Sequence, residues 1–181
     1  MRTRNASRTR DELLVAASEL FAERGFDGTT TRDIGERAGA DPALIARYFG
    51  SKAALYLATL HTDDAPRDLL DPERLADLLS RIGNQGPGPV LRAAVQRHDD
   101  EAIQGAAQTA LDERLVAPLR ARLAAAGIDR PALRAELAVA AFTGIALGRA
   151  AGALPALRDA PEDDVLALTA ELLAAISART T

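Results

Sequence analysis

The chain has 181 residues, of which 48% are apolar and only 3% are aromatic. It contains no cysteine, which excludes disulfide bonds and thiolate metal sites. The longest uncharged apolar stretch, Leu137 to Leu147, is shorter than the about 20 residues of a membrane span, and no secretory signal follows Met1. We therefore expect a cytoplasmic protein with no membrane partner.

Charge is distributed unevenly along the chain. The net charge is −4, yet residues 1–52 carry nine cations against eight acids. Four of the first ten residues are arginines, and no acid precedes Asp11. A basic N-terminal arm on an acidic body is typical of proteins that contact nucleic acid locally. The alternative is that the arm is a solvated tail.

The pattern along the chain predicts helices only, because no segment alternates apolar and polar residues with a period of two. A first helix is expected over residues 10–24. Thr9 and Glu12 have the spacing of a capping box at its start, and Gly25 suits its C-terminal cap.

Two short helices follow, joined by a tight turn. Thr30 and Asp33 form a second capping box, which predicts a helix over residues 31–38 ended by Gly39. Asp41 can cap a third helix with Pro42 at its first position, and this helix should end at Gly50. Such a pair of helices is the arrangement of a helix-turn-helix that reads DNA. An ordinary corner between two helices is the alternative.

Residues 10–55 resemble the tetracycline-repressor (TetR) family of bacterial regulators. The matching residues are Ala16, Ala17, Leu20, Phe21, Gly25, Phe26, Gly28, Thr29, Thr30, Arg32, Asp33, Ile34, Ala38, Gly39, Tyr48, Phe49, Ser51 and Lys52.

This resemblance implies a homodimer, a palindromic operator in double-stranded DNA and a small-molecule inducer. It therefore identifies the chain as a transcriptional regulator, most simply a repressor. Two positions depart from the family, which usually has alanine at Gly35 and an aromatic residue at Ala46. Glycine inside a helix costs about 1 kcal/mol relative to alanine.

The expected fold is all-α with about nine helices. Residues 1–52 would form a three-helix DNA-binding domain with its basic arm, and residues 53–181 a helical domain for ligand binding and dimerisation.

Within the first domain, arginine donors suit guanine and small apolar side chains suit thymine methyl groups. Arg47 and then Arg32 are the best base-reading candidates, and Lys52, next to the Ser51 cap, suits a phosphate. Few side chains here can donate hydrogen bonds to bases, so we expect DNA shape, and the N-terminal arm in a minor groove, to add specificity. The predicted DNA-binding residues are Thr30, Arg32, Pro42, Ala43, Leu44, Arg47, Tyr48 and Lys52.

The body should bind the inducer among its helices, where a few polar groups stand among apolar ones. The predicted ligand-binding residues are Leu60, His61, Ile82, Ile103, Gln104, Ala107, Phe142 and Ile145. The last two long helices are rich in small residues, which favours a symmetric four-helix interface between two copies. The residues expected at this interface are Ala138, Ala141, Gly144, Ile145 and Gly148 of the first of these helices and Leu166, Leu173 and Ala174 of the second. Completing the core of a monomer is the alternative for these faces.

Two other classes of function are possible for a helical chain of this length. An enzyme is not expected, because no nucleophile–base pair or phosphate loop occurs. His98 beside Asp99 and Asp100, and His61 near Asp63 and Asp64, lack the spacing of a metal site, so neither metal nor cofactor is expected. The remaining alternative is a helical small-molecule-binding protein whose DNA-binding head is vestigial.

Overall fold

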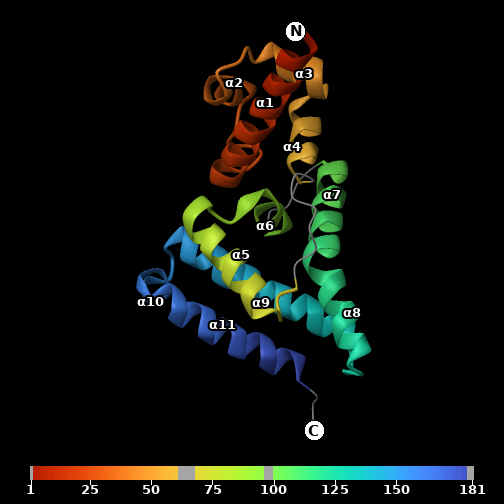
Figure 1. Cartoon of the computed structure of the whole chain (residues 1–181), viewed down its shortest axis with the longest axis vertical. Coiled ribbons are helices and arrows are strands. Elements are labelled where there is room, and N and C mark those ends of the chain that lie inside the picture. Colours follow the sequence, from red (N-terminus) through yellow and green to blue (C-terminus); the bar gives the residue numbers. More distant parts are fainter. Residues whose placement is uncertain (1, 61–67, 96–99, 179–181) are drawn as a thin grey trace. The chain divides into compact units, whose positions relative to one another are not determined.

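The computed structural model describes residues 2–60, 68–95 and 100–178, and all regular structure within these ranges is helical (Figure 1). The prediction of an all-α fold is therefore confirmed. The chain divides into two compact units, one made of residues 1–63 and 88–110 and the other of residues 64–87 and 111–181. The first unit thus contains more than the three-helix head, because three later helices, Lys52–Leu60, Gly88–Val95 and Glu101–Leu111, belong to it.

The first unit is built around its N-terminal helix, α1, which packs against α2, α4 and α6. Its elements are α1 (Arg2–Arg24), α2 (Thr31–Ala38), α3 (Ala43–Phe49), α4 (Lys52–Leu60), α6 (Gly88–Val95) and α7 (Glu101–Leu111).

The expected start of the first helix is wrong. Helix α1 begins at Arg2, so Thr9 lies inside the helix rather than capping it, and the basic arm is a helical extension. Arg8 and Glu12 lie one turn apart and form an ion pair of 2.8 Å, which suits a continuous helix. The predicted end at Gly25 is confirmed, because Gly25 has a φ of 75°.

An aromatic cluster joins α1, the following turn and α4. The rings of Phe21 and Tyr56 meet edge to face at 4.8 Å, and Phe26 lies 5.2 Å from Tyr56. Phe21 and Tyr56 are fully buried, and burial raises the pKa of Tyr56 to about 12. Each such side chain contributes about 1.5–3 kcal/mol by leaving water, so the cluster fixes α4 against α1.

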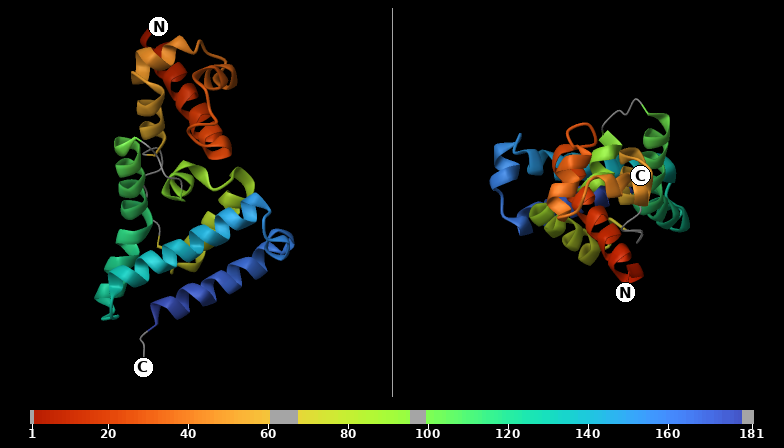
Figure 2. Two further views of the ribbon diagram at one scale, coloured as in Figure 1. Left: turned by 180° about the vertical axis from the view of Figure 1, so that it is seen from behind. Right: turned by 90° about the horizontal axis from the view of Figure 1, so that it is seen from above.

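The second unit is organised around α9, which packs against α5, α8, α10 and α11. Figures 1 and 2 show α9 and α11 side by side along much of their length. The elements of this unit are α5 (Pro72–Gln85), the π-helical segment η1 (Asp112–Val116), α8 (Ala117–Ala125), α9 (Pro131–Ala151), α10 (Pro155–Asp159) and α11 (Glu162–Ser177).

The apolar spacing predicts one helix over residues 101–126 with a break or kink at Pro118, and the structure has the π-helical segment η1 just before Ala117 and Pro118. Proline has no N–H to continue the helical hydrogen bonds, which agrees with the expected interruption. The glycines and prolines of residues 83–89 predict a loop, but the loop is much shorter, because α5 continues to Gln85 and α6 begins at Gly88. The short helix α10 has no counterpart among these expectations.

An apolar stripe on the second unit is exposed to solvent. Leu133 and Leu137 on α9 are 50% and 51% exposed, and Leu168 and Leu172 on α11 are 66% and 43% exposed. The assignment of the predicted interface residues is partly wrong, since Ala138 and Leu173 are fully buried in the unit's own core. Helix α9 is also long and apolar enough to cross a membrane by length and composition alone, with a mean hydropathy of 1.3.

Candidate nucleic-acid interface

The N-terminus of α2 is fixed by the capping box that the sequence predicts. Thr30 Oγ1 accepts a hydrogen bond of 3.1 Å from the Asp33 amide and donates one of 2.6 Å to the Asp33 carboxylate. The same carboxylate accepts the Thr30 amide at 2.9 Å. These bonds lower the pKa of Asp33. Because the Thr30 hydroxyl is already engaged, a phosphate here would meet the free amides of the first turn rather than the hydroxyl.

The turn between α2 and α3 is tight because Gly35 lets the two helices approach closely. Gly39 ends α2 with a φ of 64°, and the Ala40 amide donates to the Gly35 carbonyl at 2.9 Å. A Cβ atom on Gly35 would lie 2.7 Å from Pro42 Cγ and 2.8 Å from the Ala40 carbonyl oxygen. Both distances are shorter than a real Cβ contact, so the glycine is a packing requirement and not merely a weak helix former.

Helix α3 buries one side and exposes the other. Ile45 is buried with Ile34 of α2, whereas Ala43, Ala46 and Arg47 are exposed. Pro42, Leu44 and Tyr48 are half-buried at the edges of the exposed side. In the described part of the chain no carboxylate lies within ion-pair distance of Arg47, whose guanidinium lies 6.0 Å from the Tyr48 ring centroid. The exposed side therefore offers one available cation and several small side chains.

Asp41 helps to start α3, although the helix begins one residue later than expected. Its carboxylate accepts the Ala43 amide at 2.8 Å, and Pro42 occupies the cap position instead of the first helical position. At the other end, Gly50 follows the helix with a φ of 86°, and Ser51 Oγ accepts the Ala54 amide at 3.0 Å. The predicted end of α3 and the cap of α4 are confirmed.

Arg32 and Lys52, the cations expected beside the helix N-termini, have different surroundings. Arg32 is exposed, and within the described residues it forms an ion pair with Glu36 of its own helix, at 2.9 Å. Such a surface pair is worth about 0–1 kcal/mol, so a phosphate or base can readily replace Glu36. Lys52 instead donates from Nζ to the Phe26 carbonyl at 2.9 Å and to the Thr29 carbonyl at 3.0 Å.

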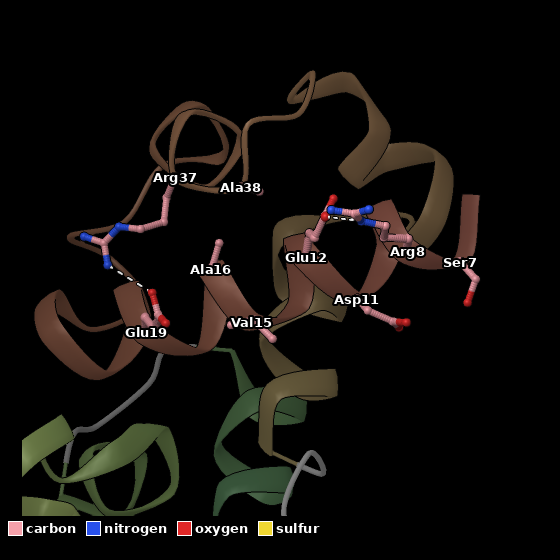
Figure 3. A pocket seen from close by; sticks show the side chains of 9 residues that line it. All are labelled: Ser7, Arg8, Asp11, Glu12, Val15, Ala16, Glu19, Arg37 and Ala38. Atoms are coloured by element: carbon pink, nitrogen blue, oxygen red, sulfur yellow. Dashed lines mark hydrogen bonds and ion pairs between the residues drawn. The ribbon is translucent and has the colours of Figure 1, made fainter. Parts of the chain in front are cut away.

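A groove of about 630 Å³ runs between α1 and α2 of the same unit (Figure 3). Val15 and Ala16 line it, and Arg37 lies at one end, where it reaches Glu19 of α1. The Arg37 guanidinium donates to both Glu23 oxygens, at 2.8 and 3.0 Å, and to Glu19 at 3.4 Å. This paired hydrogen bond lowers the pKa of Glu23 and raises that of Arg37. Arg37 therefore joins α2 to α1 through charged hydrogen bonds.

The predicted ligand-binding residues are divided between the two units. Leu60, Ile103 and Ala107 are buried in the first unit, where Gln104 is half-buried. In the second unit Ile82 and Phe142 are buried and Ile145 is half-buried. His61 lies outside the described residues. Their role in ligand binding stays a prediction.

The two histidines, His61 and His98, were not expected to bind metal. Both lie outside the described residues, as do Asp63, Asp64 and Asp99. Among the residues that are described, no three His, Cys, Asp or Glu side chains gather closely enough to hold a metal ion.

Three features of this surface were not predicted from the sequence. They are the need for glycine at position 35, the Lys52 hydrogen bonds and the Arg37–Glu23 pair. Each of these features joins residues that are separated in the sequence. Gly35 alone carried a signal in the sequence, because the family that the chain resembles usually has alanine there.

Comparison with known families covers most of the chain. Residues 13–59 match the family described as bacterial regulatory proteins, tetR family, and residues 72–176 match the tetracyclin repressor-like C-terminal domain. A transcriptional activator, FasR of Mycolicibacterium smegmatis, is 42% identical over 30% of this chain and 26% of its own. A transcriptional repressor, NicS of Pseudomonas putida, is 35% identical over 45% of this chain and 43% of its own. The chain thus spans less than half the length of these curated relatives.

A similar fold occurs in the crystal structure of a TetR-like transcriptional regulator from Rhodococcus sp. RHA1. The TM-score is 0.64 at 23% identity, over 91% of this chain and 93% of that one. This likeness extends over both units and supports the fold alone.

Proposed function

The chain belongs to the tetracycline-repressor (TetR) family of bacterial transcriptional regulators, and we propose that it is a homodimer that binds a palindromic operator and is released by a small molecule. The observation that supports this most is the capped, glycine-tightened helix pair α2–α3 with one side of α3 left open. Such a protein acts where bacterial DNA lies, in the cytoplasm, and needs no enzymatic chemistry or cofactor.

In this proposal α3 enters the major groove with its exposed side. Arg47 reads a guanine through two hydrogen bonds, and Ala43 and Leu44, with Pro42, contact thymine methyl groups. Arg32 exchanges Glu36 for the nucleic acid, and Tyr48 donates its hydroxyl to the DNA backbone.

Phosphates would be held at the helix N-termini, where free amides and the helix dipole attract anions. The turn after Thr30 supplies amides at the start of α2. Two of the three ammonium N–H groups of Lys52 donate to the carbonyls of Phe26 and Thr29, and the third would donate to a phosphate.

Dimerisation would use the exposed stripe of α9 and α11. Leu133, Leu137, Ala140 and Gly144 recur on one side of α9, and Leu168 and Leu172 lie on the neighbouring helix. A second copy of the same stripe would form a four-helix interface with two-fold symmetry. A membrane would also cover apolar surface, but Arg134 on α9 is engaged at 2.6 Å with the Ile176 carbonyl of α11, which suits a folded helix pair.

Repression is the simpler mode, because a dimer on its operator blocks polymerase. The curated relatives include both an activator and a repressor, so repression by this chain is part of the proposal and does not follow from family membership.

Operator selection from fragmented host DNA, followed by gel shift, tests DNA binding. We expect a palindromic site whose affinity falls steeply with salt. Arg47→Ala should cost about 1–3 kcal/mol at the guanine that it reads and relax specificity there. Arg158→Ala is the matched control, because it removes an exposed arginine that pairs with Asp159 in the second unit. Absence of any enriched, salt-sensitive site would favour the vestigial head, with the body acting as a small-molecule-binding protein.

Inducer binding is tested by a compound screen in which release from the operator is measured. Gln104→Ala should weaken release by an active compound by about tenfold, the effect of about 1.4 kcal/mol from one lost hydrogen bond. Operator affinity without the compound should stay unchanged. Gln108→Ala, an exposed glutamine one turn along the same helix, is the control. Equal release from both variants would remove Gln104 from the proposed ligand contacts.

A further inference from the structure

The ammonium group of Lys52 is held on three sides by the first unit. It donates to the Phe26 carbonyl at 2.9 Å and to the Thr29 carbonyl at 3.0 Å, and it lies 4.0 Å from the centroid of the Phe26 ring. An ammonium has three N–H donors, so two are already in use. Lys52 is the only lysine in the chain, and its side chain is anchored inward rather than extended into solvent.

The two carbonyls belong to the turn that leads into α2. Thr29 is fully buried, and its hydroxyl donates to the Gly25 carbonyl at 2.8 Å, which makes the turn rigid. The next residue is Thr30, the N-cap of α2. Phe26 packs on Tyr56 of α4 at 5.2 Å. Lys52, in the first turn of α4, thus connects the start of α4 with the start of α2.

We propose that Lys52 contributes to operator binding chiefly as a positioning residue, by fixing the N-terminus of α4 relative to the N-cap of α2. The inference rests on the proposed function, since it concerns how the DNA-binding surface is held. Both helix starts must meet neighbouring phosphates at once, and a small shift of either costs the contacts of both. A lysine whose main partner was a phosphate would instead act through its charge.

Salt dependence separates the two roles. Removal of a phosphate contact lowers the slope of log affinity against log salt by about 0.9, and by about twice that in a symmetric dimer. Loss of positioning lowers affinity at every salt concentration and leaves most of the slope intact. The matched variants are Lys52→Met and Arg32→Met, which each remove one cation from the first turn of a helix while keeping an unbranched stem.

We expect Lys52→Met to lower operator affinity at least tenfold while changing the salt slope by less than half as much as Arg32→Met. Phe26→Leu changes no charge and removes no group that could donate a hydrogen bond to DNA. It should nevertheless lower operator affinity at least threefold, because the aromatic ring in contact with the Lys52 ammonium is lost. The double variant should be little worse than Lys52→Met alone. All affinities are measured below the unfolding transition of each variant, as followed by circular dichroism.

A slope change in Lys52→Met as large as that of Arg32→Met would overturn the inference, as would unchanged affinity in Lys52→Met or in Phe26→Leu. These results leave the proposed function standing, provided that the unmodified protein binds its operator. Absence of salt-dependent binding by the unmodified protein would overturn the proposed function, and this inference with it.

Discussion

Replacing Gly35 with alanine is expected to lower operator affinity at least a hundredfold and to destabilise the first unit by about 1–3 kcal/mol, the usual cost of an overpacked site. The added Cβ would lie 2.7 and 2.9 Å from Pro42 Cγ and Cδ and 2.8 Å from the Ala40 carbonyl oxygen. The carbonyl belongs to a backbone that the Ala40–Gly35 hydrogen bond of 2.9 Å holds in place. The start of α3 must therefore move, and the side chains proposed to read DNA move with it.

The measurement is the free energy of unfolding together with operator affinity. Gly105→Ala is the control, since Gly105 is also a helical glycine of the first unit but, unlike the buried Gly35, is exposed and has nothing within 4 Å of its added Cβ. That control should gain up to about 1 kcal/mol of stability, the normal benefit of alanine in a helix. Pro42→Ala in the Gly35→Ala background should recover part of the lost stability, because it removes Cγ and Cδ but leaves the carbonyl. Wild-type affinity in Gly35→Ala would contradict the assigned packing role.

Local signals in the sequence predicted the helix boundaries around the proposed DNA-binding surface. The Thr30–Asp33 box, the Gly39 cap and the Ser51 cap depend on groups within four residues of each other, so their spacing is sufficient to place them. The Thr9–Glu12 spacing failed because a cap also requires the preceding residues to leave the helix, and here the chain is helical from Arg2. Capping spacing indicates where a helix can begin, not that it does.

Contacts between distant residues could not be predicted in this way. The Lys52 bonds span 26 and 23 residues, and the Arg37–Glu23 pair spans 14. The spacing of apolar residues shows which face of a helix is buried. It does not show which polar groups of distant side chains form hydrogen bonds with each other. Gly35 shows the same limit, since its weak helix propensity was evident while the carbonyl that excludes a side chain became evident only in the fold.

The interface residues of the last helices illustrate a smaller error. A stripe of small residues was expected to face a partner, but Ala138 and Leu173 pack inside the second unit. Both sides of α9 are apolar, so the sequence alone could not show which side the neighbouring helices cover. The exposed side carries Leu133 and Leu137 instead.

The Leu137→Glu variant is expected to be a monomer and to bind the full operator at least a hundredfold more weakly than the unmodified protein. Leu137 is 51% exposed, so the substitution should leave the folded subunit intact. In a symmetric dimer the same change appears twice at one interface, where two carboxylates would be buried without partners. Light scattering after size exclusion measures the mass, and gel shifts compare the full operator with a half-site.

Val95→Glu is the matched control, because Val95 is 58% exposed but lies on α6 in the first unit and does not belong to the α9–α11 stripe. It should remain dimeric. Half-site binding should be similar in Leu137→Glu and in the unmodified protein, since each half-site meets one reading head. In the proposed dimer, the full operator would gain its affinity from two heads joined at a separation near one helical turn of DNA, about 34–36 Å. A dimeric Leu137→Glu would place the interface elsewhere, whereas a monomeric variant with full operator affinity would mean that the heads bind without being joined.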